Sequence, residues 1–168
     1  RAERMLLAPQ RAGTLLAQAL EGAGPFDVVH SHNMRLFGLA AWTWLARRVA
    51  PVVHTAHDYF LVCPFSGLYR GGARCEQTCA RCDIYHSRRS ARLAALTGLT
   101  APSRHVLDVL ERRVDGVLQT PVRRVVPNGL SAPDRRARVA PASNGVLRVG
   151  YLGRLVDRKG SAAFLRAA

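Results

Sequence analysis

Short apolar runs rich in β-branched residues alternate along the chain with longer stretches that have one apolar face. Residues 26–31 (FDVVHS) and 52–55 (VVHT) have the composition of buried strands, and residues 36–49 between them have that of a helix dense in Leu, Ala and Trp. This alternation is typical of βαβ units, in which parallel strands are covered by the helices that connect them. The sequence therefore predicts an α/β fold with a doubly wound, Rossmann-like parallel sheet.

The same alternation continues through the middle of the chain. Residues 99–101 are a short strand candidate, and Ser103 is a suitable N-cap for the helix that follows. Apolar residues at helical spacing give this helix one buried face: Val106, Leu107, Leu110 and Val114. Residues 122–126 supply the next strand, so we expect residues 1–130 to form one partial domain.

The composition changes after this domain. Residues 131–145 are mostly Ser, Ala, Pro, Asp and Arg, which predicts a linker. A strand over residues 146–152 (VLRVGYL), a loop and a terminal helix then open a second domain, residues 146–168. Doubly wound domains usually have about five or six strands, and neither part reaches a full set, so we expect the fold to be truncated at both ends.

Basic residues far outnumber acidic ones. The 25 basic residues against 11 acidic ones give a formal charge of +14, and Lys159 is the single lysine among them. Nucleic-acid binders concentrate basic residues on one face, with aromatic residues or glycines between them. Here the arginines are scattered, and pairs such as Arg47/Arg48 end predicted helices, where they complement the helix dipole. We therefore expect no nucleic-acid partner, but an anionic substrate or peripheral contact with an anionic membrane surface.

No stretch of the sequence approaches the ~20 uninterrupted apolar residues that cross a bilayer. Arg47 and Arg48 end the best candidate, residues 36–46. We expect a cytoplasmic protein, and we expect any membrane association to be on the cytoplasmic face.

A loop that contains Gly153, Arg154, Lys159 and Gly160 joins the expected strand at 146–152 to the terminal helix. Gly153 lets the backbone approach a ligand closely, and Arg154 can grip phosphate oxygens with its fork of donors. Lys159 adds a point charge, and free backbone N–H groups follow Gly160. The loop has neither the Walker nor the dinucleotide-binding pattern. The loop is suited to binding an anion. The alternative interpretation is an ordinary turn whose basic side chains are solvated.

Five short motifs occur in one order along the chain: DVVHSHN at 27–33, VVHTAHDY at 52–59, APS at 101–103, VVPNG at 125–129, and GRL followed by KG within 153–160. With these motifs the chain resembles, from residue 26 onward, the family 4 (group 1) retaining glycosyltransferases of GT-B fold. In that family two Rossmann-like domains face each other across a cleft. The resemblance implies that residues 1–130 belong to the acceptor-side domain and that residues 146–168 begin the donor-binding domain.

The resemblance also implies roles for individual residues. Arg154 and Lys159 would hold the diphosphate of a UDP-, GDP- or ADP-sugar, and the transfer would need no metal ion or other cofactor. His57 would line the cleft near the transferred sugar as a catalytic residue, and Asp58 would orient that imidazole or the local loop. His30, His32 and His54 we interpret as structural histidines. The glycine-rich loop that precedes the first motif in the family, and the paired glutamates that follow the last, are absent, so we expect this fragment alone to be inactive.

Four cysteines lie in a loop expected over residues 60–86, which follows the HD motif. Cys63, Cys75, Cys79 and Cys82 have the spacing C-x11-C-x3-C-x2-C, and four thiolates suffice for a tetrahedral zinc ion or an iron–sulfur cluster. Zinc would order a loop that is too polar to fold by burial, and it is our hypothesis for this cluster. Disulfides or free thiols are the alternatives.

The sequence thus predicts a retaining glycosyltransferase that moves a hexose-type sugar from a nucleotide sugar to an acceptor whose identity it leaves open. Two other functions remain: a non-catalytic module that binds a sugar or nucleotide, and a metal-bound nucleic-acid module that rests on the cysteines and the charge.

Overall fold

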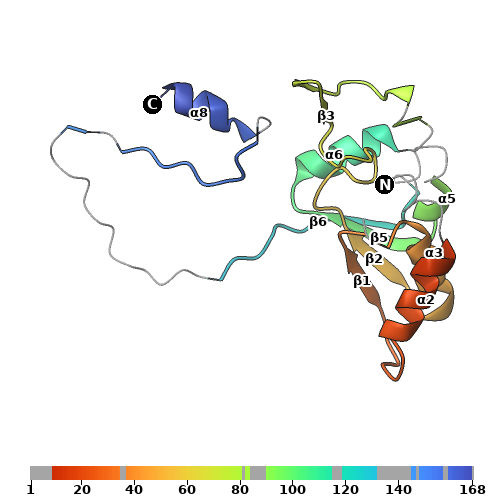
Figure 1. The fold of residues 1–168 in the computed structure, drawn as a ribbon. Helices are drawn as coiled ribbons and strands as arrows, with labels where there is room; N and C mark the ends of the chain where they lie inside the picture. The colour runs from red at the N-terminus through yellow and green to blue at the C-terminus, as the bar shows by residue number, and fades with distance from the viewer. Residues whose placement is uncertain are drawn as a thin grey trace. The chain divides into compact units, whose positions relative to one another are not determined.

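The computed structural model describes residues 9–34, 37–80, 82–83, 90–114, 119–131, 145–146, 148–156 and 159–167. The chain divides into two units, both drawn in Figure 1. The first contains Arg1–Leu68 and Cys75–Asn128, and the second contains Tyr69–Arg74 and Gly129–Ala168.

The first unit is built on a parallel sheet of four strands in the order β1-β2-β5-β6 (Figure 1). The strands are β1 (Val29–His32), β2 (Val52–Thr55), β5 (Leu96–Ala101) and β6 (Val122–Val125). All three neighbouring pairs run parallel. Such pairing requires long crossover connections, which the chain fills with helices. The sheet confirms the predicted α/β, Rossmann-like class.

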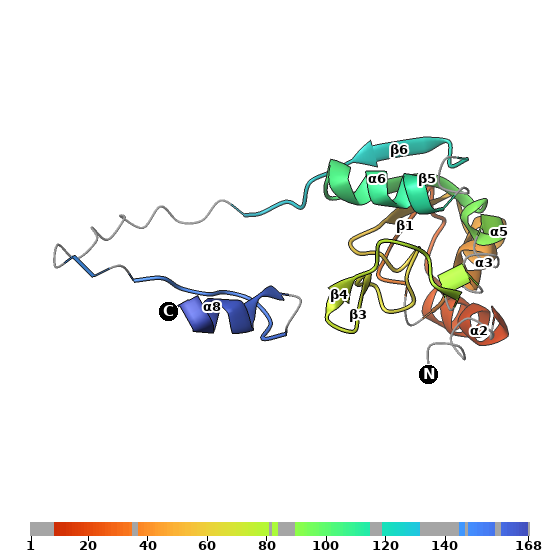
Figure 2. The ribbon, with the colours of Figure 1, turned by 90° about the horizontal axis from the view of Figure 1, so that it is seen from above.

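Helices cover the sheet and form the core with it. They are α2 (Pro9–Ala19), α3 (Ala40–Arg48), α5 (Ser90–Leu93) and α6 (Arg104–Arg113). In Figures 1 and 2, α6 lies against β5, and α2 packs on α3. The largest fully buried side chains come from strands, helices and loops alike: Trp42, Leu61, Leu93, Leu99, Leu107 and Leu110. Each contributes roughly 1.5–3 kcal/mol through burial, so this core holds the sheet and its carboxyl edge in place.

The N-cap predicted for α6 is confirmed. The Ser103 side chain accepts a hydrogen bond from the Val106 backbone N–H at 3.3 Å, with Ser103 itself in an extended conformation. Such a cap satisfies one of the free N–H groups of the first helical turn and typically stabilises by about 1 kcal/mol. Leu107 and Leu110 are buried beneath it, as the spacing predicted.

Some predicted boundaries move. The first strand begins at Val29 rather than at residue 26, because Gly22 and Gly24 adopt positive φ and turn the chain just before it. Phe26 is left 41% exposed in that turn. The third strand begins earlier than predicted, at Leu96, since its pairing with Val52 extends the ladder.

The second unit contains a hairpin and the C-terminal segment. Strands β3 (Tyr69–Arg70) and β4 (Ala73–Arg74) are antiparallel, and Gly71 and Gly72 between them both have positive φ, as a two-residue hairpin turn of the primed type requires. The C-terminal segment ends in α8 (Ser161–Ala167), close to the predicted terminal helix.

The strand predicted over residues 146–152 is wrong, because residues 146 and 148–152 are not in a strand. Strand conformation is stabilised by pairing with a neighbouring strand, and no described residue of the second unit pairs with this segment. Residues 132–144 of the predicted linker lie outside the described residues. Among the residues that are described, no helix is long and apolar enough to cross a membrane.

Candidate functional site

Two histidines meet at the carboxyl edge of the sheet. His32 is the last residue of β1, and His57 follows the end of β2 by two residues. His32 Nδ1 lies 2.8 Å from His57 Nε2, while the ring centres are 5.1 Å apart and the rings are tilted by only 25°. The rings therefore meet edge to edge, with the hydrogen bond close to both ring planes. One nitrogen must donate and the other accept, so the two rings share a single proton in this contact.

A chain of polar groups continues along the same face of the sheet. The His30 ring centre is 4.3 Å from that of His32, and His30 Nε2 lies 2.7 Å from Thr55 Oγ1. Thr55 Oγ1 in turn lies 2.7 Å from Thr100 Oγ1. In-register neighbours in a parallel sheet point to the same side, so this chain links β1, β2 and β5 and fixes the ring beneath His32.

The electrostatic environment keeps His32 neutral. Desolvation lowers the pKa of His32 below its ordinary value, and the nearby His30 and His57 lower it further because they would repel a second charge. At neutral pH, His32 therefore offers its partner an uncharged ring.

The opposite face of the same two strands carries a buried polar network. The Trp42 Nε1–H donates to Ser31 Oγ at 3.1 Å, and Ser31 Oγ lies 3.0 Å from His54 Nδ1. Burial lowers the pKa of His54 to about 3, with smaller contributions from the charges of His32, His57 and His30. His54 is thus neutral and hydrogen-bonded inside the core, in agreement with a structural role.

Asp58 organises the loop that follows β2. Its Oδ1 accepts the Phe60 backbone N–H at 2.8 Å, which closes a side-chain turn directly after His57. The Tyr59 carbonyl then accepts from the N–H groups of Val62 and Cys63, at 3.0 and 2.7 Å. Of the two roles expected for Asp58, the described contacts correspond to orienting the loop.

The cysteine loop is tied to the core near its start and near its middle. Cys63 is buried, and the Arg113 guanidinium of α6 donates to the carbonyls of Cys75 and Glu76, both at 2.8 Å. Burial raises the pKa of the Cys82 thiol to about 11, together with a hydrogen bond to Cys79 and the charges that Cys79 and Cys63 would carry.

The four cysteines are free thiols. Over the described parts of the chain, which include all four, no three His, Cys, Asp or Glu side chains are arranged so that they could hold a metal ion. The zinc hypothesis therefore stays a prediction.

The glycine–arginine loop belongs to the second unit. Arg154 and Lys159 are exposed, and the Tyr151 hydroxyl lies 3.1 Å from the Arg154 carbonyl and 3.3 Å from the Lys159 carbonyl. A Cβ at Gly153 would come within 3.2 Å of that hydroxyl, and Gly160 has φ +75°, so both positions favour glycine. Tyr151 thus holds the two halves of the loop together, with the side chains of Arg154 and Lys159 exposed.

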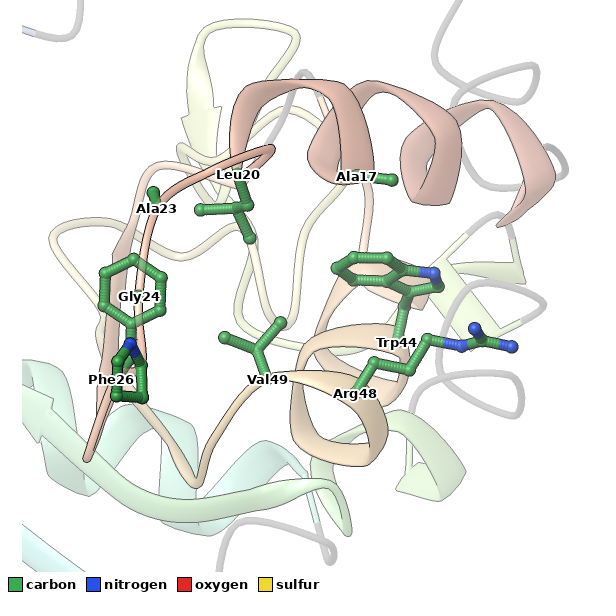
Figure 3. Close-up of a pocket in the computed structure, with 9 residues that line it drawn as sticks. Ala17, Leu20, Ala23, Gly24, Phe26, Trp44, Arg48 and Val49 are labelled. Carbon is green, nitrogen blue, oxygen red and sulfur yellow. The ribbon is translucent and has the colours of Figure 1, made fainter.

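An open cavity of about 470 Å³ lies between α2, α3 and the turn before β1, and none of the predicted site residues lines it. Figure 3 shows Ala17 and Leu20 facing Trp44 and Val49 across it. The turn before β1 and Val49 before β2 both precede their strands, so the cavity lies at the amino edge of the sheet. Ligands of such sheets bind at the carboxyl edge, which favours the histidine pair as the site.

His32 is the residue that sequence reasoning misses. The sequence pattern favours a structural role for it, yet the structure places it directly on His57. The signal that could have found it is its position: the strand ending at His32 and the strand running into His57 are consecutive in a βαβ pattern, so their carboxyl ends are neighbours.

Comparison with known proteins bears on this site. Residues 1–132 match the family described as Glycosyltransferase Family 4. The chain is 28% identical over 166 residues to a D-inositol 3-phosphate glycosyltransferase of Mycolicibacterium vanbaalenii, covering 94% of this chain and 34% of the relative. A protein of the same description from Salinispora tropica is 46% identical over 46 residues, 27% of this chain and 9% of that relative. The chain thus spans about a third of the first relative's length, at 34%. No solved structure matches the chain.

Proposed function

The chain belongs to glycosyltransferase family 4, and on that premise we propose that the protein transfers a sugar from a nucleotide-sugar donor to a hydroxyl acceptor with retention of anomeric configuration. The observation that carries the proposal is the His32–His57 pair at the carboxyl edge of a parallel sheet, where ligands of such folds bind. Retention is the stereochemistry that the resemblance to the family implies.

In the proposed reaction His57 acts at the sugar. Its ring is exposed at the sheet edge, and the Asp58–Phe60 hydrogen bond fixes the turn that carries it. An imidazole in that place can form a hydrogen bond with a sugar hydroxyl, because His32 engages one of its nitrogens and no described residue is hydrogen-bonded to the other. A group held in this way contributes by positioning, since its rotational freedom is already restricted.

Arg154 and Lys159 act at the donor diphosphate. When the bond between the sugar and the nucleotide breaks, negative charge grows on the distal phosphate, and two fixed cations stabilise that charge more in the transition state than in the ground state. The Tyr151 hydroxyl, which reaches the carbonyls of both residues, supports the loop conformation that presents them. This arrangement supplies the charge that a metal ion would otherwise provide.

The acceptor to test first follows from the relatives. Both matched proteins are described as D-inositol 3-phosphate glycosyltransferases, and the longer match covers most of this chain. We propose a phosphorylated polyol as the first acceptor, since the formal charge of +14 favours anionic substrates. An anionic membrane surface is the second negatively charged partner that the positive charge of the chain favours. Adding anionic vesicles to the assay tests it.

The test uses the protein that the complete gene encodes. Purified protein is incubated with UDP-, GDP- and ADP-sugars and candidate acceptors, and both transfer and the anomeric configuration of the product are measured. We expect Arg154→Ala and Lys159→Ala each to lower kcat by about a hundredfold, the scale for losing one group that stabilises developing charge. Arg166→Ala, an exposed change on α8, is the matched control and should retain activity.

Other outcomes of this test contradict the proposal. Nucleotide-sugar binding without transfer would identify a binding module instead. A product of inverted anomeric configuration would contradict the proposed retention. Full activity in both Arg154→Ala and Lys159→Ala would contradict the proposed binding of the donor diphosphate by these side chains.

The zinc hypothesis has its own measurement. Metal content of the protein purified under reducing conditions should approach one zinc per chain and fall in Cys79→Ser if the cysteines rearrange around an ion. Protein without zinc or iron would leave the four residues as thiols that order the loop through burial of Cys63 and the Arg113 contacts.

A further inference from the structure

The contact between His32 and His57 restricts the chemistry of both rings. A neutral imidazole has one N–H and one lone pair, so the nitrogen that enters the contact determines the state of the other nitrogen. If His57 donates from Nε2, its Nδ1 carries a lone pair; if His57 accepts at Nε2, its Nδ1 carries the proton. The tautomer of His57 is therefore set by what His32 presents to it.

The surroundings of His32 are compatible with its role as the acceptor. Its ring is kept uncharged by desolvation and by the neighbouring histidines, which lower its pKa, so it has a lone pair to offer. The His30 ring packs 4.3 Å beneath it and is itself held by Thr55, which limits rotation of His32. Within the described residues, no hydrogen bond joins His57 Nδ1 to another group, so this atom is available to a ligand.

We propose that His32 is a positioning residue that accepts the Nε2–H of His57 and thereby leaves the lone pair of His57 Nδ1 for a substrate hydroxyl. The inference rests on the proposed function for the identity of the substrate, but the hydrogen bond and the tautomer can be measured without any substrate. His32 is not a catalytic residue, since it acts only through His57.

Protonation of the pair abolishes this arrangement. A proton added at His57 Nδ1 would leave the Nε2–H bonded to His32 and would turn Nδ1 from an acceptor into a donor. The other groups that bear on the pair are His30 from β1, His54 from β2 and Asp58, whose carboxylate is occupied by the Phe60 N–H. Activity that depends on the lone pair should therefore fall at acidic pH.

The direct test is NMR of the complete gene product labelled with ¹⁵N in its histidines. We expect a scalar coupling between His32 Nδ1 and His57 Nε2 across the hydrogen bond, and ring shifts that identify His57 as the Nε2–H tautomer. The Nδ1–H tautomer of His57, or two rings without coupling, would overturn the proposal. This readout also separates the two hypotheses, because a protein that transfers no sugar can still show the coupled pair.

Kinetics supply the second test. His32→Leu removes the acceptor, and we expect kcat to fall by about tenfold or more with a smaller change in KM, and the acidic limb of the pH profile to move to lower pH. His32→Asn places an amide oxygen close to where Nδ1 lies, so it should restore most of the activity and the position of the limb. His105→Asn, on the exposed face of α6, is the control. Equal loss in His32→Leu and His32→Asn with an unchanged pH profile would show that His32 serves only the fold.

Discussion

Histidines lie on both faces of the sheet at β1 and β2, exposed on one face and buried on the other. On the open face, His32 and His57 are exposed and joined to each other at 2.8 Å. On the helix-covered face, His54 is 4% exposed and is joined to Ser31, which also accepts from Trp42. The buried ring has a hydrogen bond to Ser31 inside the protein, whereas the exposed pair lies open to solvent. Burial, rather than residue type, separates the histidine that we interpret as structural from the one that we propose as functional.

The largest expected effect is on activity at the open face. His57→Ala should lower kcat/KM by at least about a hundredfold, or roughly 3 kcal/mol, because it removes the group that we propose contacts the sugar. The free energy of unfolding should change by less than about 0.5 kcal/mol, since the ring is exposed. Steady-state kinetics and denaturant unfolding on the same preparation test both parts. Full activity would show that the pair is not the site.

The matching change on the covered face should do the reverse. His54→Ala removes a buried side chain and leaves Ser31 without one partner, so we expect a loss of about 2–4 kcal/mol in unfolding free energy. The kcat of the folded fraction should stay within about twofold of the original. His105→Ala, exposed on α6, is the control for stability. A stable His54→Ala protein without activity would reverse the roles of the two faces.

The pH dependence of the free energy of unfolding gives a further test of the buried face. Burial lowers the pKa of His54 to about 3, so below pH 6.5 the unfolded chain binds a proton that the folded chain does not. Stability from this group is therefore fully present above pH 6.5 and is lost as the pH falls toward 3. Between pH 7 and 5 we expect a loss of up to about 2 kcal/mol. His54→Gln should flatten this dependence, and an equally steep curve in that variant would assign it to other groups.

The smallest expected effect concerns the hydroxyl at the centre of the buried network. Ser31→Ala leaves the Trp42 Nε1–H without its acceptor and His54 Nδ1 without its partner, so we expect a loss of about 1–2 kcal/mol in unfolding free energy. The His32–His57 coupling measured by NMR should remain, because Ser31 points to the other face of the strand. Loss of that coupling would show that the two faces are not independent.

Much of the fold and part of the site could be read from the chain. The alternation of apolar runs with amphipathic stretches predicts the parallel sheet, and the Ser103 cap is predicted correctly because capping depends on residues a few positions apart. The resemblance to the family predicts His57 as a cleft residue, and so does its position just after the end of a parallel strand. They do not predict its partner, since the contact with His32 joins residues 25 positions apart and depends on the register of β1 with β2.

The sequence by itself determined what local interactions and apolar patterning determine: the alternation of strands and helices that builds the parallel sheet, and the N-cap at Ser103. The tertiary structure decided which histidine is buried with Trp42 and which meets His57, and that residues 148–152 are not in a strand. The reason is the range of the interactions. Capping and amphipathicity act within one element, whereas burial, register and ligand geometry arise only when distant segments pack together.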